Sequence, residues 1–161
     1  MAVAMYLNID GVTGECQATG FTNWIDIFSY SVGASNPTTV GTGTGSGAGK
    51  VSVSSMSIQK TIDTSTPSLF LNCASGNHFD KAEVQVLEAG GAAPVAFLLI
   101  DFTQVFIDSI SWGGSSGGGK PSESVTFSFA TIQFTYTPQL ATGAAGSPIP
   151  FGWNILTNTQ M

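Results

Sequence analysis

Few residues of this chain have the types and spacing that a catalytic site needs, and the most suggestive is a serine set among glycines. Gly113-Gly-Ser-Ser-Gly matches the G-x-S-x-G pattern of a nucleophile elbow, which requires a helix directly after the serine. Gly118-Gly-Lys-Pro follows instead. The single histidine, His78, precedes the serine, which reverses the usual hydrolase order. We therefore expect no serine nucleophile here.

A second glycine-rich stretch, Gly45-Ser-Gly-Ala-Gly-Lys, is similar to a phosphate-binding loop. The Walker A pattern needs glycine where Thr44 stands and serine or threonine where Val51 stands, so the match fails at both ends. We expect no nucleotide site and no other cofactor.

Candidate metal ligands are also too few. His78, Asp80 and Cys73 form the only cluster that could imitate a metal site, and no second histidine joins them. Cys16 and Cys73 are too few for a disulfide framework, so we expect reduced, buried thiols. Carboxylates in the predicted strands and turns show no spacing that pairs them for acid–base catalysis. They are Glu15, Asp26, Asp63, Asp101, Asp108 and Glu123. We expect no catalytic and no metal-binding residue.

Composition limits the remaining classes of function. The chain has 161 residues, 42% of them hydrophobic, which suits one domain over residues 1–161. Only 9% of residues are charged, and the net charge of −6 leaves no basic surface for nucleic acid or an anionic membrane. The longest apolar stretch, 95–110, is interrupted by polar residues and is too short to span a bilayer. Because the N-terminus lacks the pattern of a secretory signal, we expect synthesis in the cytoplasm without a signal peptide, with any export by a dedicated machine.

The pattern of apolar residues predicts an all-β fold with one short helix. Alternating segments with changes of parity at Ser54-Ser55 and near Ala130-Thr131 indicate bulged, antiparallel strands that close into a small barrel of two packed sheets. The exception is residues 66–76, where we predict a helix with Thr66 as N-cap, Pro67 in the first turn and Gly76 as the left-handed terminator.

Two neighbouring segments carry the predicted interaction surfaces. Phe21 to Val32 reads as one strand, in which Ile25, Ile27, Ser29 and Ser31 share a parity that changes from aliphatic to small and polar. Residues 33–50 are rich in glycine, serine and threonine, have almost nothing to bury, and read as a long flexible loop.

Together, several motifs resemble those of the haemolysin-coregulated protein (Hcp) family from Met5 to the C-terminus. The helix and its flanks carry the resemblance, with further motifs on either side. These are Gly47-Ala-Gly-Lys-Val, Ala89-Gly-Gly, Gly113-Gly-Ser-Ser-Gly and Gly152-Trp-Asn. The resemblance implies a non-enzymatic tube subunit of the type VI secretion system, a β-barrel that forms hexameric rings. The stacked rings would make a hollow, ejected tube that carries small effector proteins, so the implied partners are other copies, the sheath, a spike protein and cargo.

Site residues follow from that implied assembly. Ser31 and Ser29 would face the lumen, with Tyr30 and Val32 as the alternative if the register differs by one. The 33–50 loop would order on meeting a neighbouring subunit or ring. The candidate contacts between subunits or rings are Asn36, Thr42, Thr44, Ser46, Lys50 and Glu123. The alternatives are a phage tail-tube-like protein, or, in a different class, a secreted β-sandwich binding module.

Overall fold

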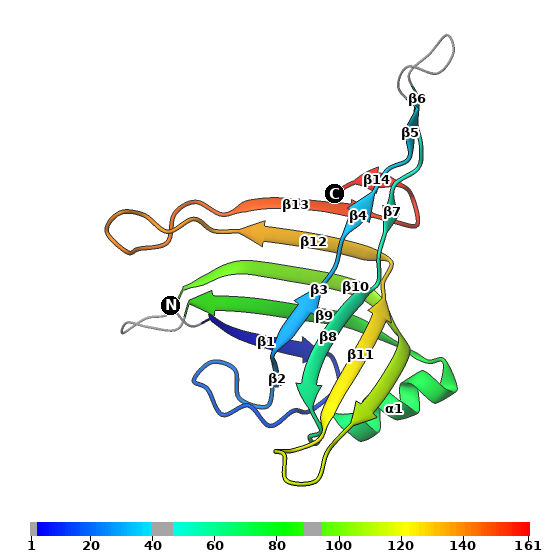
Figure 1. Ribbon diagram of the computed structural model, residues 1–161. Coiled ribbons are helices and arrows are strands. Elements are labelled where there is room, and N and C mark those ends of the chain that lie inside the picture. Colours follow the sequence, from blue (N-terminus) through cyan, green and yellow to red (C-terminus); the bar gives the residue numbers. More distant parts are fainter. Residues whose placement is uncertain (1–2, 40–46, 89–94) are drawn as a thin grey trace.

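The computed structural model describes residues 3–39, 47–88 and 95–161. They form many β-strands and one helix (Figure 1). The helix is α1 (Thr66–Ser75). The strands are β1 (Val3–Ile9), β2 (Ile25–Ile27), β3 (Ser29–Ser31), β4 (Ala34–Ser35), β5 (Thr38–Thr39), β6 (Gly47–Ala48), β7 (Ser52–Val53), β8 (Met56–Thr61), β9 (His78–Glu88), β10 (Ala96–Gly113), β11 (Ser122–Ser128), β12 (Thr131–Tyr136), β13 (Ile149–Asn154) and β14 (Thr159–Gln160). No helix among these residues is long and apolar enough to span a bilayer.

The strands build two layers that share β10. The first layer contains β2, β1, β9, the first half of β10, β12, β13 and β14, and the second contains the last part of β10 (107–113), β11, β8 and β3. Figure 1 shows the strands of the two layers crossing at a large angle. Gln104 lies in β10 with a positive φ of 52°, between the residues that pair with β12 and those that pair with β11, and this local turn of the backbone lets one strand belong to both layers. The two packed sheets predicted from the sequence are confirmed.

The predicted closed barrel is not formed by the described residues. β2 pairs with β1 while β3 pairs with β8, and Phe28 separates the two short strands. Among the described residues β2 pairs only with β1 and β3 pairs only with β8, so neither short strand joins the two layers along this edge to close a barrel. The prediction of one strand across Phe21 to Val32 is therefore wrong.

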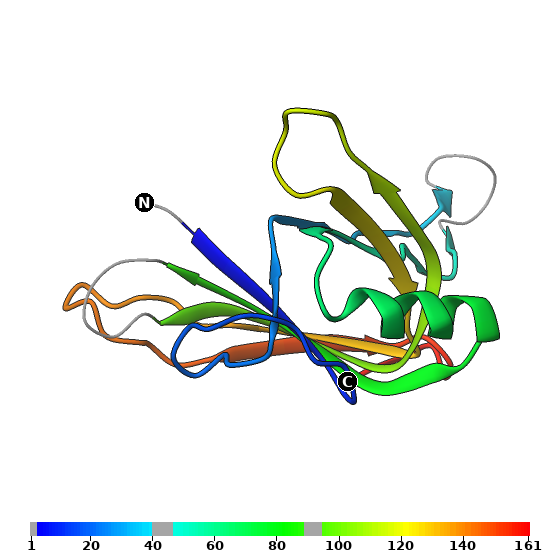
Figure 2. The same cartoon turned by 90° about the horizontal axis from the view of Figure 1, so that it is seen from below.

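The core lies between the layers and is covered at one end by α1. Its largest fully buried apolar side chains include Phe102 and Phe127, whose rings meet edge to face at 5.2 Å. Leu69 is the buried residue of α1, and the helix packs against β10, which Figure 2 shows from a second direction.

The ends of α1 were predicted with one error. Gly76 has the left-handed φ of 76° and its N–H donates to the carbonyl of Asn72, as predicted for a C-cap. The N-cap is Ser65, whereas Thr66 is already helical. The Thr66 hydroxyl instead accepts the backbone N–H of Asp63 at 3.2 Å.

Candidate functional site

The second layer presents an outward face made of small hydroxyl and amide side chains. Pairing across the strands sets them in two rows, since Ser31 opposes Ser57 and Ser57 opposes Thr126, while Ser29 opposes Gln59 and Gln59 opposes Ser124. We call this surface the hydroxyl face: Ser29, Ser31, Ser57, Gln59, Ser109, Ser111, Ser124 and Thr126. The intervening residues Ile58 and Val125 are buried, so the period of two produces one apolar and one polar side.

Hydrogen bonds between strands order part of the hydroxyl face. The Ser124 hydroxyl donates to Oε1 of Gln59 at 2.7 Å, and the hydroxyls of Ser57 and Thr126 lie 3.3 Å apart. The outermost members, Ser29, Ser31, Ser109 and Ser111, are exposed. The result is an uncharged surface that offers both donors and acceptors.

Asp108 adds a carboxylate beside this face. It lies at the register shift of β10 between Ile107 and Ser109, where it accepts the hydroxyls of Ser55 and Ser128, each at 2.9 Å. The two serines hold the charge in place at the end of the row that contains Ser31.

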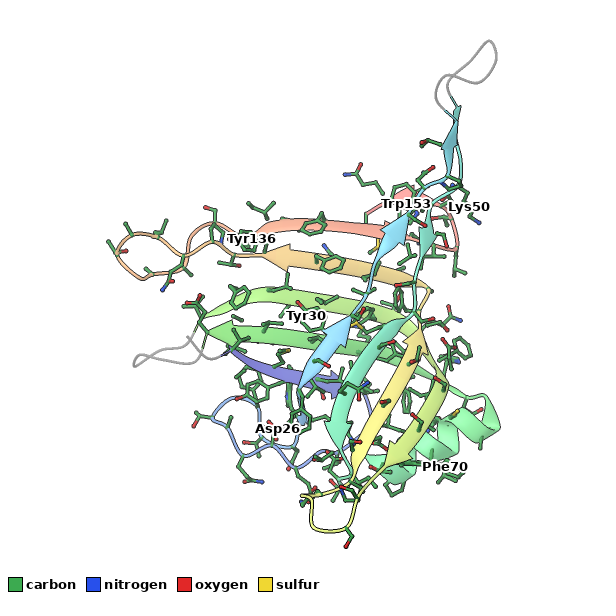
Figure 3. All side chains as sticks on the ribbon, viewed as in Figure 1. Asp26, Tyr30, Lys50, Phe70, Tyr136 and Trp153 are labelled. Carbon is green, nitrogen blue, oxygen red and sulfur yellow. The ribbon has the colours of Figure 1, made fainter. Side chains whose placement is uncertain are left out.

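Ser29 and Ser31 are exposed on this face, but the shared parity with Ile25 and Ile27 from which they were predicted is not observed. Ile25 and Ile27 do not share their side, because both are buried while the two serines are exposed. The break at Phe28 reverses the parity, so the aliphatic pair points into the core. Tyr30, the alternative in a shifted register, is half-buried and packs against the core (Figure 3).

The segment predicted as a flexible loop is a two-stranded arm in its described part. β4 pairs with β7 and β5 pairs with β6, which continues β3 and β8 outward from the body (Figure 1). Gly49 donates its N–H to the Pro37 carbonyl at 2.9 Å. Two of the predicted contact residues, Asn36 and Lys50, are exposed on the arm, whereas Thr42, Thr44 and Ser46 lie outside the described residues.

Glu123, another predicted contact residue, faces into the chain. It is fully buried and forms an ion pair with the fully buried Lys60. Its carboxylate also accepts the Trp112 indole N–H at 2.8 Å and the Thr66 hydroxyl at 3.1 Å. Because Lys60 lies 3.0 Å from Asp63 as well, the network joins β8, β11 and the start of α1. We therefore do not include Glu123 in the assembly proposed below.

The residues considered for catalysis or metal binding are not gathered into a site. The His78 ring packs against Phe106 at 5.3 Å, and its Nε2 is 3.8 Å from Asp80. Burial raises the pKa of the Cys16 thiol, which disfavours a reactive thiolate. Both cysteines are free, and no group of three or more histidine, cysteine or acidic side chains among the described residues could hold a metal.

Comparison with known proteins assigns the family. Residues 6–136 match the family model described as type VI secretion system effector, Hcp. The chain is 42% identical to Protein hcp1 of Pseudomonas aeruginosa over 161 residues, which cover 99% of each protein. A solved structure of a type six secretion system protein matches with a TM-score of 0.94 and 30% identity, covering 99% of this chain and 100% of that one. The structure of Hcp1 from Salmonella typhimurium matches with a TM-score of 0.83 and 30% identity over the whole of both chains. The chain therefore belongs to the Hcp family of the type VI secretion system.

Proposed function

We propose that this chain is a non-enzymatic tube subunit of a type VI secretion system, in which six copies close into a ring and rings stack into a hollow, secreted tube. Membership of the Hcp family supports a role in the type VI secretion system. The hydroxyl face is the observation that supports a tube with an open lumen. Ser31 and its neighbours would line the lumen, where a wet, uncharged wall suits passage of effector proteins.

The edges of the second layer support closure of a ring. The layer has the order β10, β11, β8, β3, and every neighbouring pair is antiparallel. Its two edge strands therefore run in opposite directions. Within the described residues, β3 pairs only with β8, and residues 107–113 of β10 pair only with β11. Copies related by rotation would bring β3 of one beside β10 of the next in antiparallel orientation, so the ladder could continue around a lumen.

The hydroxyl face favours transport over tight capture. Neutral hydroxyls hydrogen-bond to water or to cargo with small net free energy, so a cargo could exchange one partner for the other along the wall. The arm, with Asn36 and Lys50 exposed, would contact the neighbouring subunit or ring. The sheath, the spike protein and small effectors complete the expected partners.

Light scattering of the purified chain tests the proposal. We expect a particle of six times the 16.6 kDa chain that persists on dilution, because ring contacts of an obligate assembly bury a large area. A stable monomer at micromolar concentration would contradict the tube and favour a monomeric binding module. A ring that forms without any type VI secretion genes nearby in the genome would favour a phage tail-tube relative.

A further inference from the structure

A cavity of about 670 Å³ lies between the base of the arm and the β12–β13 hairpin. Ala34, Val51 and Val53 line it from the arm side. Phe134 and Trp153 line it from the hairpin side. None of the lining residues is charged. Folded interiors are close-packed, so an open apolar cavity of this size indicates a site for an occupant.

The lining of the cavity indicates what kind of occupant it would take. Because the lining carries no charge and consists largely of aliphatic and aromatic side chains, the occupant should be apolar.

The distribution of charge identifies a second copy of this chain as that occupant. From Ser124 to Met161 the sequence contains no aspartate, glutamate, lysine, arginine or histidine, so all the acidic residues that give the chain its net charge of −6 lie before this stretch. Copies of an acidic protein repel each other least where they meet through uncharged surface. Within this uncharged stretch, Leu140 is 51% exposed and Ile149 is 53% exposed.

The cavity and the exposed loop lie at opposite ends of one hairpin. Figure 3 shows Trp153 beside the arm and Tyr136 toward the loop that joins β12 to β13, and Figure 1 shows this loop projecting away from the arm. A loop at one end and a cavity at the other make a head-to-tail contact, which is the type that closes rings.

We propose that the 137–148 loop of one copy, led by Leu140, occupies the cavity of the next copy. The proposal rests on the ring assembly proposed above and specifies its contact.

Two variants, each of which blocks one half of the contact, test the proposal. Ala34→Trp fills the cavity and leaves the loop free, whereas Leu140→Asp puts a charge on the loop and leaves the cavity open. We expect each variant alone to be monomeric by light scattering. An equimolar mixture should form one-to-one dimers and no rings, since only one loop and one cavity remain usable. Ser116→Trp and Leu71→Asp, at exposed positions on the 114–121 turn and on α1, are the matched controls and should form rings as the wild type does.

Cross-linking covers the case in which either variant fails to fold. Ala34→Cys combined with Leu140→Cys should give a ladder of covalent oligomers under mild oxidation, and Ala34→Cys combined with Leu71→Cys should not. Rings from Ala34→Trp or Leu140→Asp, a mixture that stays monomeric, or the absence of the ladder would each overturn the loop-in-cavity contact. These results would leave the tube proposal standing, provided that the wild type still forms rings.

Discussion

The buried ion pair of Lys60 and Glu123 shows how single residues hold this fold. Both side chains are fully buried, and each has further polar partners: Lys60 lies near Asp63, and Glu123 accepts from Trp112 and Thr66. Because both charged groups have additional polar partners, the ion pair can be buried in the core, although its net contribution to stability is small.

Removing one member of this pair should be far worse than removing both. Lys60→Met leaves the Glu123 carboxylate buried without its counter-charge, and we expect a loss of about 3–5 kcal/mol in the free energy of unfolding. Lys60→Met with Glu123→Leu should recover much of that loss. Urea unfolding at fixed chain concentration measures both. A double variant no more stable than the single one would show that the network, beyond its charge balance, holds α1 in place.

Asp101 makes the stability of the fold depend on pH, and the direction of this dependence follows from the shift of its pKa. Burial, and secondarily the facing carboxylate of Glu83 on β9, raises the pKa of Asp101, while Lys81 opposes the shift. A raised pKa means that the folded state binds the proton more tightly than the unfolded state, so the ionised carboxylate destabilises the fold. This cost is complete above the raised pKa of the folded state and disappears as the pH falls from that pKa to the lower pKa of the unfolded state.

Asp101→Asn should therefore raise the thermal midpoint at pH 7, and the gain should shrink as the pH falls far enough to protonate the wild-type carboxyl. Thermal unfolding at a series of pH values checks this. Asp80→Asn, at a side chain that is 87% exposed, is the matched control and should change little. A gain from Asp101→Asn that persists undiminished at low pH would exclude the charge as its cause.

Ser31 is where the proposed cargo role can be tested. Ser31→Glu adds a bulky charge to an exposed position of the hydroxyl face without touching the core, so we expect intact rings and a loss of effector binding and export. Ser116→Glu, on the exposed 114–121 turn, provides the control. Co-purification of effector with each ring measures the difference. Wild-type binding and export by a well-folded Ser31→Glu ring would exclude this face as the lumen.

Among the structural elements, the arm is held together by close backbone contacts that leave no room for a side chain at Gly49. A Cβ on Gly49 would lie 2.6 Å from the Pro37 carbonyl oxygen, closer than atoms can approach. Gly49→Ala should therefore disturb the β5–β6 end of the arm, which packs no core residue, and leave the unfolding midpoint of the subunit nearly unchanged. Rings should dissociate at a higher chain concentration, as measured by light scattering on dilution. Gly119→Ala, where a Cβ meets open space, is the control. Equal ring stability in both variants would argue against a role for the arm in assembly.

Features set by single residues or short segments were predicted well from the sequence, whereas features set by pairing between distant segments were not. Gly76 ends α1 because glycine adopts the left-handed conformation without steric cost, and the changes of parity at 54–55 and 130–131 coincide with real breaks between strands. Pairing within the arm was missed because a backbone ladder leaves no apolar pattern. The bend of β10 at Gln104 was missed because a non-glycine residue gives no sign of a positive φ.

The same limit applies to the candidate site. Ser31 was found from its own strand, but the hydroxyl face also needs Ser57, Thr126 and Ser109, which the register of distant strands brings together. Glu123 was predicted as a contact between subunits or rings from the implied assembly, and the fold alone pairs it with Lys60.

As a whole molecule, the isolated subunit leaves several surfaces without a partner. Its second layer ends in two unpaired strand edges among the described residues, an apolar cavity lies under the arm, and the last part of the sequence carries no charged side chain. Exposed edges and uncharged surface invite association, which a closed ring would direct into one defined assembly.

Electron cryo-microscopy of the purified wild-type chain tests the central claim most directly, because one map shows both the number of copies and the direction each face points. We predict closed six-membered rings with a central channel, lined by the strands that carry Ser31, Ser57 and Thr126. Rings in which the hydroxyl face points outward, or particles with no channel, would contradict the account.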